Sequence, residues 1–271
     1  MTQMKTMATK TTPLLEVKGV TLTFKGIAAL TDVGFSVEKG RIVSLIGPNG
    51  AGKTSILNCI SGRYTPDSGE IYLDGQDMLR LPAHKRTGLG LSRTFQNIAL
   101  FKGLSVLDNL MVGRHHLIHY GLLSSILYHG RAVADEATHR RRVEDVIDFL
   151  GLSPYRHQAA GHLPYGVQKR VELGRALAAE PKLILLDEPM AGMNLEETED
   201  MARYILDICE EWGATVLLIE HDMGVVMDIS DKIVVLDFGS VLAQGRPDEI
   251  SANQDVIAAY LGTEDATFIG R

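Results

Sequence analysis

Cysteine is scarce in this chain, with two among 271 residues, and tryptophan occurs once. Cys59 and Cys209 both lie inside apolar periodic runs, which indicates two small buried side chains rather than a disulfide or a metal-binding pair. A chain of this length can bury a sizeable core without cross-links. The sequence therefore excludes a disulfide-rich secreted scaffold and is typical of a reducing cytoplasm.

Long hydrophobic runs are also missing. The longest apolar stretches, such as Leu183 to Leu186 and Val216 to Ile219, are far shorter than the about 20 apolar residues that a membrane-spanning helix needs. The formal charge of −7 disfavours nucleic acid as a partner, because non-specific binding needs a basic surface. Residues 1–13 lack a continuous apolar core, so we expect a disordered tail rather than a signal peptide.

Two kinds of strand pattern are present. Leu14 to Val17, Thr21 to Phe24 and Val33 to Val37 alternate between apolar and polar residues, which predicts antiparallel strands with turns at Gly19 and Gly26.

The second kind is a short continuous apolar run, typical of a buried parallel strand. Ile42 to Ile46 is one, and it leads into a helix from Lys53. Leu183 to Leu186, Val216 to Ile219 and Ile233 to Leu236 are three more, and helical patterns lie between them. This alternation predicts a mostly parallel sheet with helices on both faces. One of those helices includes Met201 and Trp212 and is predicted to end at Gly213.

The pattern changes between Asn97 and Gly161, where strand signals vanish. An amphipathic helix that contains Val143 and Leu150 is stopped by Gly151. We interpret this stretch as a helical subdomain inserted into the α/β core. The predicted organisation is a tail (1–13), a first core part (14–96), the helical subdomain (97–162), a second core part (163–262) and a C-terminal tail (263–271).

A phosphate-binding loop is the strongest chemical signal. Residues Gly47 to Thr54 match G-x-x-x-x-G-K-[ST] between a strand and a helix, the context that a P-loop requires. The glycines allow backbone N–H groups to face phosphate oxygens at a helix N-terminus. Lys53 is predicted to reach the β and γ phosphates, and the Thr54 hydroxyl to bind Mg²⁺. The complete set of predicted phosphate-binding residues is Gly47, Asn49, Gly50, Ala51, Gly52, Lys53, Thr54 and Ser55.

Many NTPases contain a P-loop, so the second acidic motif is informative. Four apolar residues place Asp187 at the carboxyl end of a buried strand, where it can bind Mg²⁺. The adjacent Glu188 can polarise an attacking water. The guanine-reading motif Asn-Lys-x-Asp is missing, which disfavours a GTPase. The fold class predicted is α/β, a P-loop NTPase core with an antiparallel β subdomain and an inserted helical subdomain.

Five ordered motifs are present: Gly47 to Thr54, Thr94-Phe95-Gln96-Asn97, Leu163-Pro164-Tyr165-Gly166-Val167-Gln168, Asp187-Glu188-Pro189 and Glu220-His221-Asp222. In this order the chain resembles the ATPases of ABC transporters over about residues 14 to 262. The resemblance implies ATP as the nucleotide, with Mg²⁺.

The resemblance also implies roles for single residues. Gln96 matches the glutamine that senses Mg²⁺ and the water, and His221 the histidine that contacts the γ-phosphate. Asn194 falls where the family usually has an aspartate that communicates with the opposite subunit. Phe24 falls where the family places an aromatic ring for adenine, and the alternative is a core phenylalanine on a strand.

The family signature Leu-Ser-Gly-Gly-Gln is altered here. Pro164 replaces the serine whose hydroxyl usually meets the partner's γ-phosphate, and proline also lacks an N–H. Gly166 is retained, and the N–H groups of Gly166 and Val167 at the start of the next helix can still face an anion.

Closer similarity points to the ATPases of branched-chain amino-acid importers, through the segments from Leu218 to Met223 and from Val256 to Gly262. That branch also serves urea, short amides and organic acids. The resemblance implies a second ATP-binding subunit, two membrane-spanning permease subunits, an external substrate-binding protein that acts indirectly, and a place at the cytoplasmic face of the membrane. We expect the permease groove near Gln96, Phe101 and Leu104.

Two alternatives remain. A soluble ABC-type ATPase has no membrane partner, but heptads and a second P-loop are missing from this sequence. A non-hydrolysing nucleotide sensor is disfavoured by Glu188 and His221. A cluster of histidines is interpreted as a solvated or partner-facing surface rather than a metal site; its members are His115, His116, His119 and His129.

Overall fold

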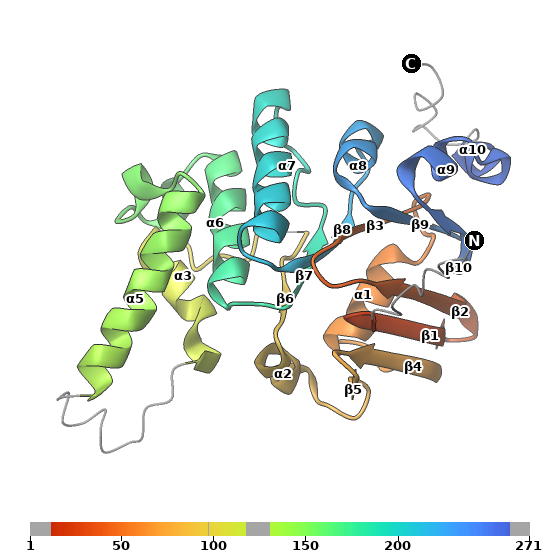
Figure 1. Ribbon diagram of the computed structural model, residues 1–271, viewed down its shortest axis with the longest axis horizontal. Coiled ribbons are helices and arrows are strands. Elements are labelled where there is room, and N and C mark those ends of the chain that lie inside the picture. The colour runs from red at the N-terminus through yellow and green to blue at the C-terminus, as the bar shows by residue number, and fades with distance from the viewer. Residues whose placement is uncertain (1–11, 97, 118–130, 261–271) are drawn as a thin grey trace, which may run out of the picture.

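Two sheets and the helices around them make up the fold, as Figure 1 shows. The computed structural model describes residues 12–96, 98–117 and 131–260. Residues 1–11 of the predicted N-terminal tail, the predicted C-terminal tail, Asn97, His119 and His129 lie outside the described residues.

The larger sheet has six strands in the order β10-β9-β3-β8-β7-β6. Its strands are β3 (Ile42–Ile46), β6 (Leu91–Arg93), β7 (Leu183–Asp187), β8 (Thr215–Ile219), β9 (Lys232–Asp237) and β10 (Ser240–Gly245). All neighbouring pairs are parallel except β9 and β10, which are antiparallel at one edge. The four apolar runs noted in the sequence are β3, β7, β8 and β9, so the predicted parallel sheet is confirmed.

The smaller sheet is antiparallel, in the order β2-β1-β4-β5. Its strands are β1 (Leu15–Phe24), β2 (Ile27–Val37), β4 (Ser68–Leu73) and β5 (Gln76–Asp77). The predicted turn at Gly19 is wrong: β1 runs through this residue, and the register shifts between Val17 and Val20. Gly19 has a φ of +59°, a conformation that suits a glycine bulge. The turn at Gly26 is confirmed.

The described helices follow the predicted alternation. They are α1 (Lys53–Ser61), α2 (Ala83–Arg86), α3 (Val106–Gly113), α5 (Arg131–Phe149), α6 (Tyr165–Ala178), α7 (Leu195–Glu210), α8 (Met223–Ile229), α9 (Pro247–Ser251) and α10 (Gln254–Tyr260), with short 3₁₀ turns at Thr87–Leu89, His115–Leu117, Ser153–Tyr155 and Ala160–His162. Helix α7 ends at Glu210, two residues before Trp212, so the observed helix is shorter than the predicted one.

Two large cores lie on opposite faces of the six-stranded sheet. Leu185 and Leu217 pack with α1 and the smaller sheet, whereas Ile184 and Leu218 pack with α3, α5, α6 and α7. Successive strand residues point to opposite faces, so β7 and β8 supply both cores, and residues 183–186 and 216–219 are all apolar. Figure 1 shows α3, α5 and α6 gathered at one end and the small sheet at the other.

Within the described ranges, no helix combines the length and the apolar character that crossing a membrane would need.

Candidate functional site

The predicted site residues meet at one edge of the large sheet, because the strands that precede them are parallel and neighbouring. The P-loop follows β3, Gln96 follows β6, Asp187 ends β7, and His221 follows β8. The carboxyl ends of parallel strands share an edge, which is where ligands bind in open α/β sheets.

The P-loop requires glycine at two close approaches. A Cβ at Gly47, where φ is +147°, would lie 2.1 Å from the carbonyl oxygen of Leu236. A Cβ at Gly52, where φ is +100°, would lie 2.8 Å from the carbonyl oxygen of Ala29. Gly52 is also the N-cap of α1 and provides no side-chain cap. The first-turn N–H groups of α1 are therefore suited to an anion.

Lys53 lies under this loop. It is 7% exposed, and its Nζ donates to the carbonyl oxygens of Gly47 at 2.5 Å and Pro48 at 3.1 Å. The ammonium group is thus held inside the curve of the loop. Of the other predicted phosphate-binding residues, Ala51 is buried, Ser55 is half-buried, and Asn49, Gly50 and Thr54 are exposed.

Glu188 is held by two side chains from other strands. Its Oε1 lies 3.0 Å from His221 Nε2, and its Oε2 accepts a hydrogen bond from Gln96 Nε2 at 2.9 Å. The Glu188 backbone has a φ of +51°, a conformation uncommon outside glycine. The fold therefore brings Gln96, Glu188 and His221 together, although 92 residues separate the first two.

Asp187 differs from Glu188 in its burial and its partners. Its Oδ2 accepts a hydrogen bond from the Arg93 guanidinium at 2.9 Å, and both side chains are less than a tenth exposed. Its Oδ1 is buried and has no hydrogen-bond partner among the described residues. A buried carboxylate oxygen without a partner is costly unless a ligand satisfies it, so this oxygen is suited to bind a cation.

Side chains of helix α6 form hydrogen bonds with the backbone around Gln96. The buried Lys169 donates from Nζ to the carbonyl oxygens of Gln96 and Glu188, both at 3.3 Å. One turn later, the Glu172 carboxylate accepts from the N–H groups of Phe95 at 3.3 Å and Ala99 at 3.4 Å. Burial raises the pKa of Glu172. The signature helix is thus bonded to both the glutamine segment and the residue after Asp187.

Sequence reasoning missed Arg93, Lys169 and Glu172. Arg93 and Lys169 are adjacent to recognised motifs and Glu172 lies one helical turn after Gln168, but charged residues there are also typical of a solvated surface. For Arg93, the sequence feature that could have revealed it is a charged residue at the end of a buried strand. For Lys169 and Glu172, it is a charged residue at a position where the helical period of α6 places buried side chains.

Glu220 is a further buried carboxylate at this edge. It accepts from the N–H groups of Met190 at 2.8 Å and His221 at 3.0 Å, and burial raises its pKa. Glu220 thereby links the backbone just after Glu188 to the backbone of His221.

Phe24 is not a core residue: it is 42% exposed. Its ring packs edge-on against Tyr64, with 5.1 Å between the ring centroids. The alternative interpretation as a core phenylalanine is therefore wrong, and the adenine role stays a prediction.

The altered signature starts helix α6. Pro164 is its exposed N-cap, one position before the first residue of the helix. Gly166 is buried, and a Cβ there would lie 2.3 Å from Glu197 Oε1. Asn194 and Glu197 form a capping box at the start of α7. Asn194 thus has a local role, while its contact with an opposite subunit stays a prediction.

A hollow of about 320 Å³ lies between the core and the helical end, and we call it the groove cavity. Phe101 and Leu104 are exposed, as expected for a partner surface, but they do not line it. Among the residues that line it are Ser61, Arg86, Arg93, Phe95, Val112 and Arg175.

Both cysteines are free thiols, and Cys59 is buried as predicted, whereas Cys209 is half-buried. Burial raises the pKa of Cys59 to about 11 and of Cys209 to about 12. His115 and His116 lie in a 3₁₀ turn. Within the ranges that the structure covers, no group of three histidine, cysteine or acidic side chains is arranged to hold a metal ion.

Comparisons with known proteins agree with this geometry. The ABC transporter family profile matches residues 30–191, and the profile of the branched-chain amino acid ATP-binding cassette transporters matches residues 240–266. The high-affinity branched-chain amino acid transport ATP-binding protein BraF of Pseudomonas aeruginosa is 43% identical over 92% of this chain and 98% of its own length. The corresponding LivG protein of Escherichia coli is 40% identical over the same shares.

A solved structure gives the same result. The ATP-binding cassette of an ABC transporter, crystallised in its ADP conformation, superposes with a TM-score of 0.81 at 31% identity and covers 93% of this chain and 100% of that one. With a P-loop, an acidic strand end and a glutamine and histidine that converge on Glu188, this chain belongs to the ATP-binding, ATP-hydrolysing proteins of the ABC transporter family.

Proposed function

We propose that this chain hydrolyses ATP·Mg²⁺ to energise a membrane importer of branched-chain amino acids or of a related amide, urea or organic acid. The observation on which the proposal rests is the position of Glu188, which Gln96 and His221 hold one residue after the buried Asp187. This is an arrangement for orienting a water at the end of a phosphate site.

The nucleotide would lie along the P-loop. Backbone N–H groups between Gly47 and Ser55 would face the phosphates, and Lys53 would exchange its loop carbonyls for phosphate oxygens. Phe24 offers an exposed ring face for adenine.

The donor set also fits Mg²⁺, which prefers oxygen ligands. Asp187 Oδ1 is buried without a partner among the described residues, and Thr54 is an exposed residue that carries a hydroxyl. The amide nitrogen of Gln96 donates to Glu188, which leaves its amide oxygen as a further oxygen ligand. Bound Mg²⁺ would neutralise charge on the phosphates.

Glu188 would act as the general base. Its two oxygens are held from both sides, so the carboxylate is oriented before a substrate arrives, and such preorganisation lowers the cost of reaching the transition state. His221 would contact the γ-phosphate.

A second subunit, of the same or a different chain, would complete each site. The exposed start of α6, with Pro164 and Tyr165, offers first-turn N–H groups to the nucleotide of the partner. A dimeric bacterial ABC transporter cassette has the same fold, with a TM-score of 0.73 and 26% identity. Gly166 would contribute its backbone there.

Two permease subunits would hold the chain at the cytoplasmic face of the membrane, and an external substrate-binding protein would act on it through them. The groove cavity, with Phe95 and Val112 at 41% and 40% exposure, offers an apolar seat for a permease segment. The relatives named above are branched-chain amino acid transport proteins, which favours these amino acids over the other substrates.

The test is reconstitution. The chain would be co-purified from membranes with its multi-span partner, placed in proteoliposomes, and assayed for ATP-dependent uptake of labelled leucine, urea and a short amide. We expect leucine uptake that disappears with Glu188→Gln. Full ATPase activity in the soluble fraction, with no multi-span protein bound, would favour a soluble ABC-type ATPase instead.

A further inference from the structure

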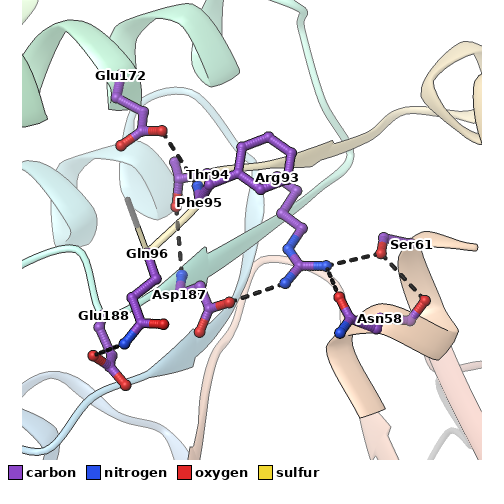
Figure 2. A network of polar contacts seen from close by, with 9 residues as sticks. All are labelled: Asn58, Ser61, Arg93, Thr94, Phe95, Gln96, Glu172, Asp187 and Glu188. Carbon is purple, nitrogen blue, oxygen red and sulfur yellow. Dashed lines mark hydrogen bonds and ion pairs between the residues drawn. The ribbon is translucent and has the colours of Figure 1, made fainter. Parts of the chain in front are cut away.

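Arg93, the last residue of β6, is a buried cation that the proposed chemistry does not use. Its side chain is 9% exposed. One guanidinium nitrogen, Nη1, donates to Asn58 Oδ1 at 2.7 Å and to Ser61 Oγ at 2.9 Å, both on α1. The other, Nη2, donates to Asp187 Oδ2. Figure 2 shows this one side chain between α1 and the end of β7.

The two oxygens of Asp187 consequently have different surroundings. Oδ2 is bound to Arg93, while Oδ1 is buried without a partner among the described residues. A carboxylate is planar, so fixing Oδ2 also sets the direction in which Oδ1 points. Hydrogen bonds to the second oxygen of a ligating carboxylate commonly orient it for its metal.

Arginine suits this position better than lysine. The planar guanidinium reaches Asp187 and α1 at the same time, with a fixed angle between its donors. A lysine ammonium on a flexible stem could bind one of these partners but could not fix their relative orientation.

Arg93 also faces the groove cavity, which it lines together with Phe95. The guanidinium carbon lies 5.6 Å from the centroid of the Phe95 ring, within the range of a cation–π contact. Phe95 is 41% exposed, so a molecule that fills the groove cavity can contact this ring and displace it.

We propose that Arg93 is a positioning residue for Mg²⁺, which orients Asp187 Oδ1 towards the ion and links the groove cavity to the metal site. The inference rests on the proposed function, in which Asp187 binds Mg²⁺.

The test measures metal binding rather than turnover. Mn²⁺ binding to the purified, ATP-loaded chain would be followed by electron paramagnetic resonance, and ATP binding in EDTA by calorimetry. We expect Arg93→Met to weaken Mn²⁺ binding by about tenfold or more, the usual effect of losing a partner of a metal ligand. ATP affinity in EDTA should change less than about twofold, because Arg93 does not contact the P-loop. Arg93→Lys should recover part of the Mn²⁺ affinity.

Two matched controls separate position from stability. Arg86→Met removes another buried cation that lines the groove cavity and bonds to α1, at the carbonyl oxygens of Cys59 and Ile60, but has no contact with Asp187, so Mn²⁺ affinity should stay unchanged. Phe95→Ala should weaken Mn²⁺ binding by about two- to threefold, because it removes the cation–π contact that helps to hold Arg93. Phe101→Ala removes an exposed ring that has no contact with Arg93 and should leave Mn²⁺ binding unchanged.

The outcomes are distinguishable. If Asp187→Asn leaves Mn²⁺ binding intact, the proposed metal site itself is wrong. If Asp187→Asn weakens it but Arg93→Met does not, only the inference about Arg93 is wrong. If thermal unfolding shows that Arg93→Met does not fold, Arg93→Lys and Phe95→Ala decide, and wild-type Mn²⁺ affinity in both would overturn the proposal.

Discussion

Replacing Glu188 by glutamine tests the proposed general base with little change in shape. The side chain is 17% exposed and lies between Gln96 and His221. An amide keeps the volume and one accepting oxygen, so the contact with Gln96 can persist. The new amide nitrogen must then donate to His221 Nε2, which requires the imidazole tautomer with its proton on Nδ1. The geometry survives, while the basic oxygen is lost.

The expected loss is about 10²- to 10⁴-fold in the rate of hydrolysis, the usual contribution of a general base. This corresponds to about 3 to 5 kcal/mol of the barrier, since a tenfold change in rate is about 1.4 kcal/mol. ATP affinity should stay within about twofold, because Glu188 has no contact with the P-loop. Nucleotide-dependent dimers should accumulate, since the step that reopens them is slow.

Phosphate release, calorimetric ATP titration and size-exclusion chromatography with ATP measure these three quantities. Glu196→Gln is the matched control, because Glu196 is an exposed carboxylate in the first turn of α7 and should leave the rate unchanged. Undiminished turnover of Glu188→Gln would refute the role of this carboxylate.

Four further predictions use other parts of the structure. Lys53→Ala should abolish useful ATP affinity, because the ammonium is the charge that the loop holds for the phosphates; near wild-type affinity in calorimetry would contradict the P-loop assignment. Pro164→Ser should raise ATPase activity of the assembled transporter several-fold, since one neutral donor to a charged acceptor contributes about 1.5 to 3 kcal/mol at most. Equal ATPase rates for the wild type and the variant, both in the native pair and in the isolated chain, would place position 164 away from nucleotide. Asn194→Ala should lower the free energy of unfolding by about 1 kcal/mol through loss of the α7 cap, as urea unfolding would measure, and Asn194→Asp should retain it. Glu172→Gln should remove part of the pH dependence of stability, because burial raises the pKa of Glu172 in the folded state above its ordinary value and the wild type therefore loses stability as pH rises through the raised pKa. The free energy of unfolding in urea, measured from acid to neutral pH, checks this, and the same pH dependence in wild type and variant would argue against it.

The sequence by itself determined the parts whose signal is local. Glycine spacing between an apolar run and a helix predicted the P-loop, and four consecutive apolar residues before Asp187 predicted β7 with its carboxylate at the strand end. Those patterns follow from backbone freedom and burial of single segments, which neighbouring residues decide. The same local logic failed at Gly19, because a glycine in the left-handed region suits a bulge as well as a turn, and only the pairing of β1 with two strands settles which one forms.

Tertiary structure alone decided which side chains meet. The strand order places β6 beside β7 and β8 on its other side, and this brings Gln96 and His221 to the two oxygens of Glu188. It also turns Arg93, which has the sequence character of a surface arginine, into a buried partner of Asp187. Contacts across 92 or 94 residues depend on sheet order and register, and those are fixed by the packing of both cores together rather than by any one segment.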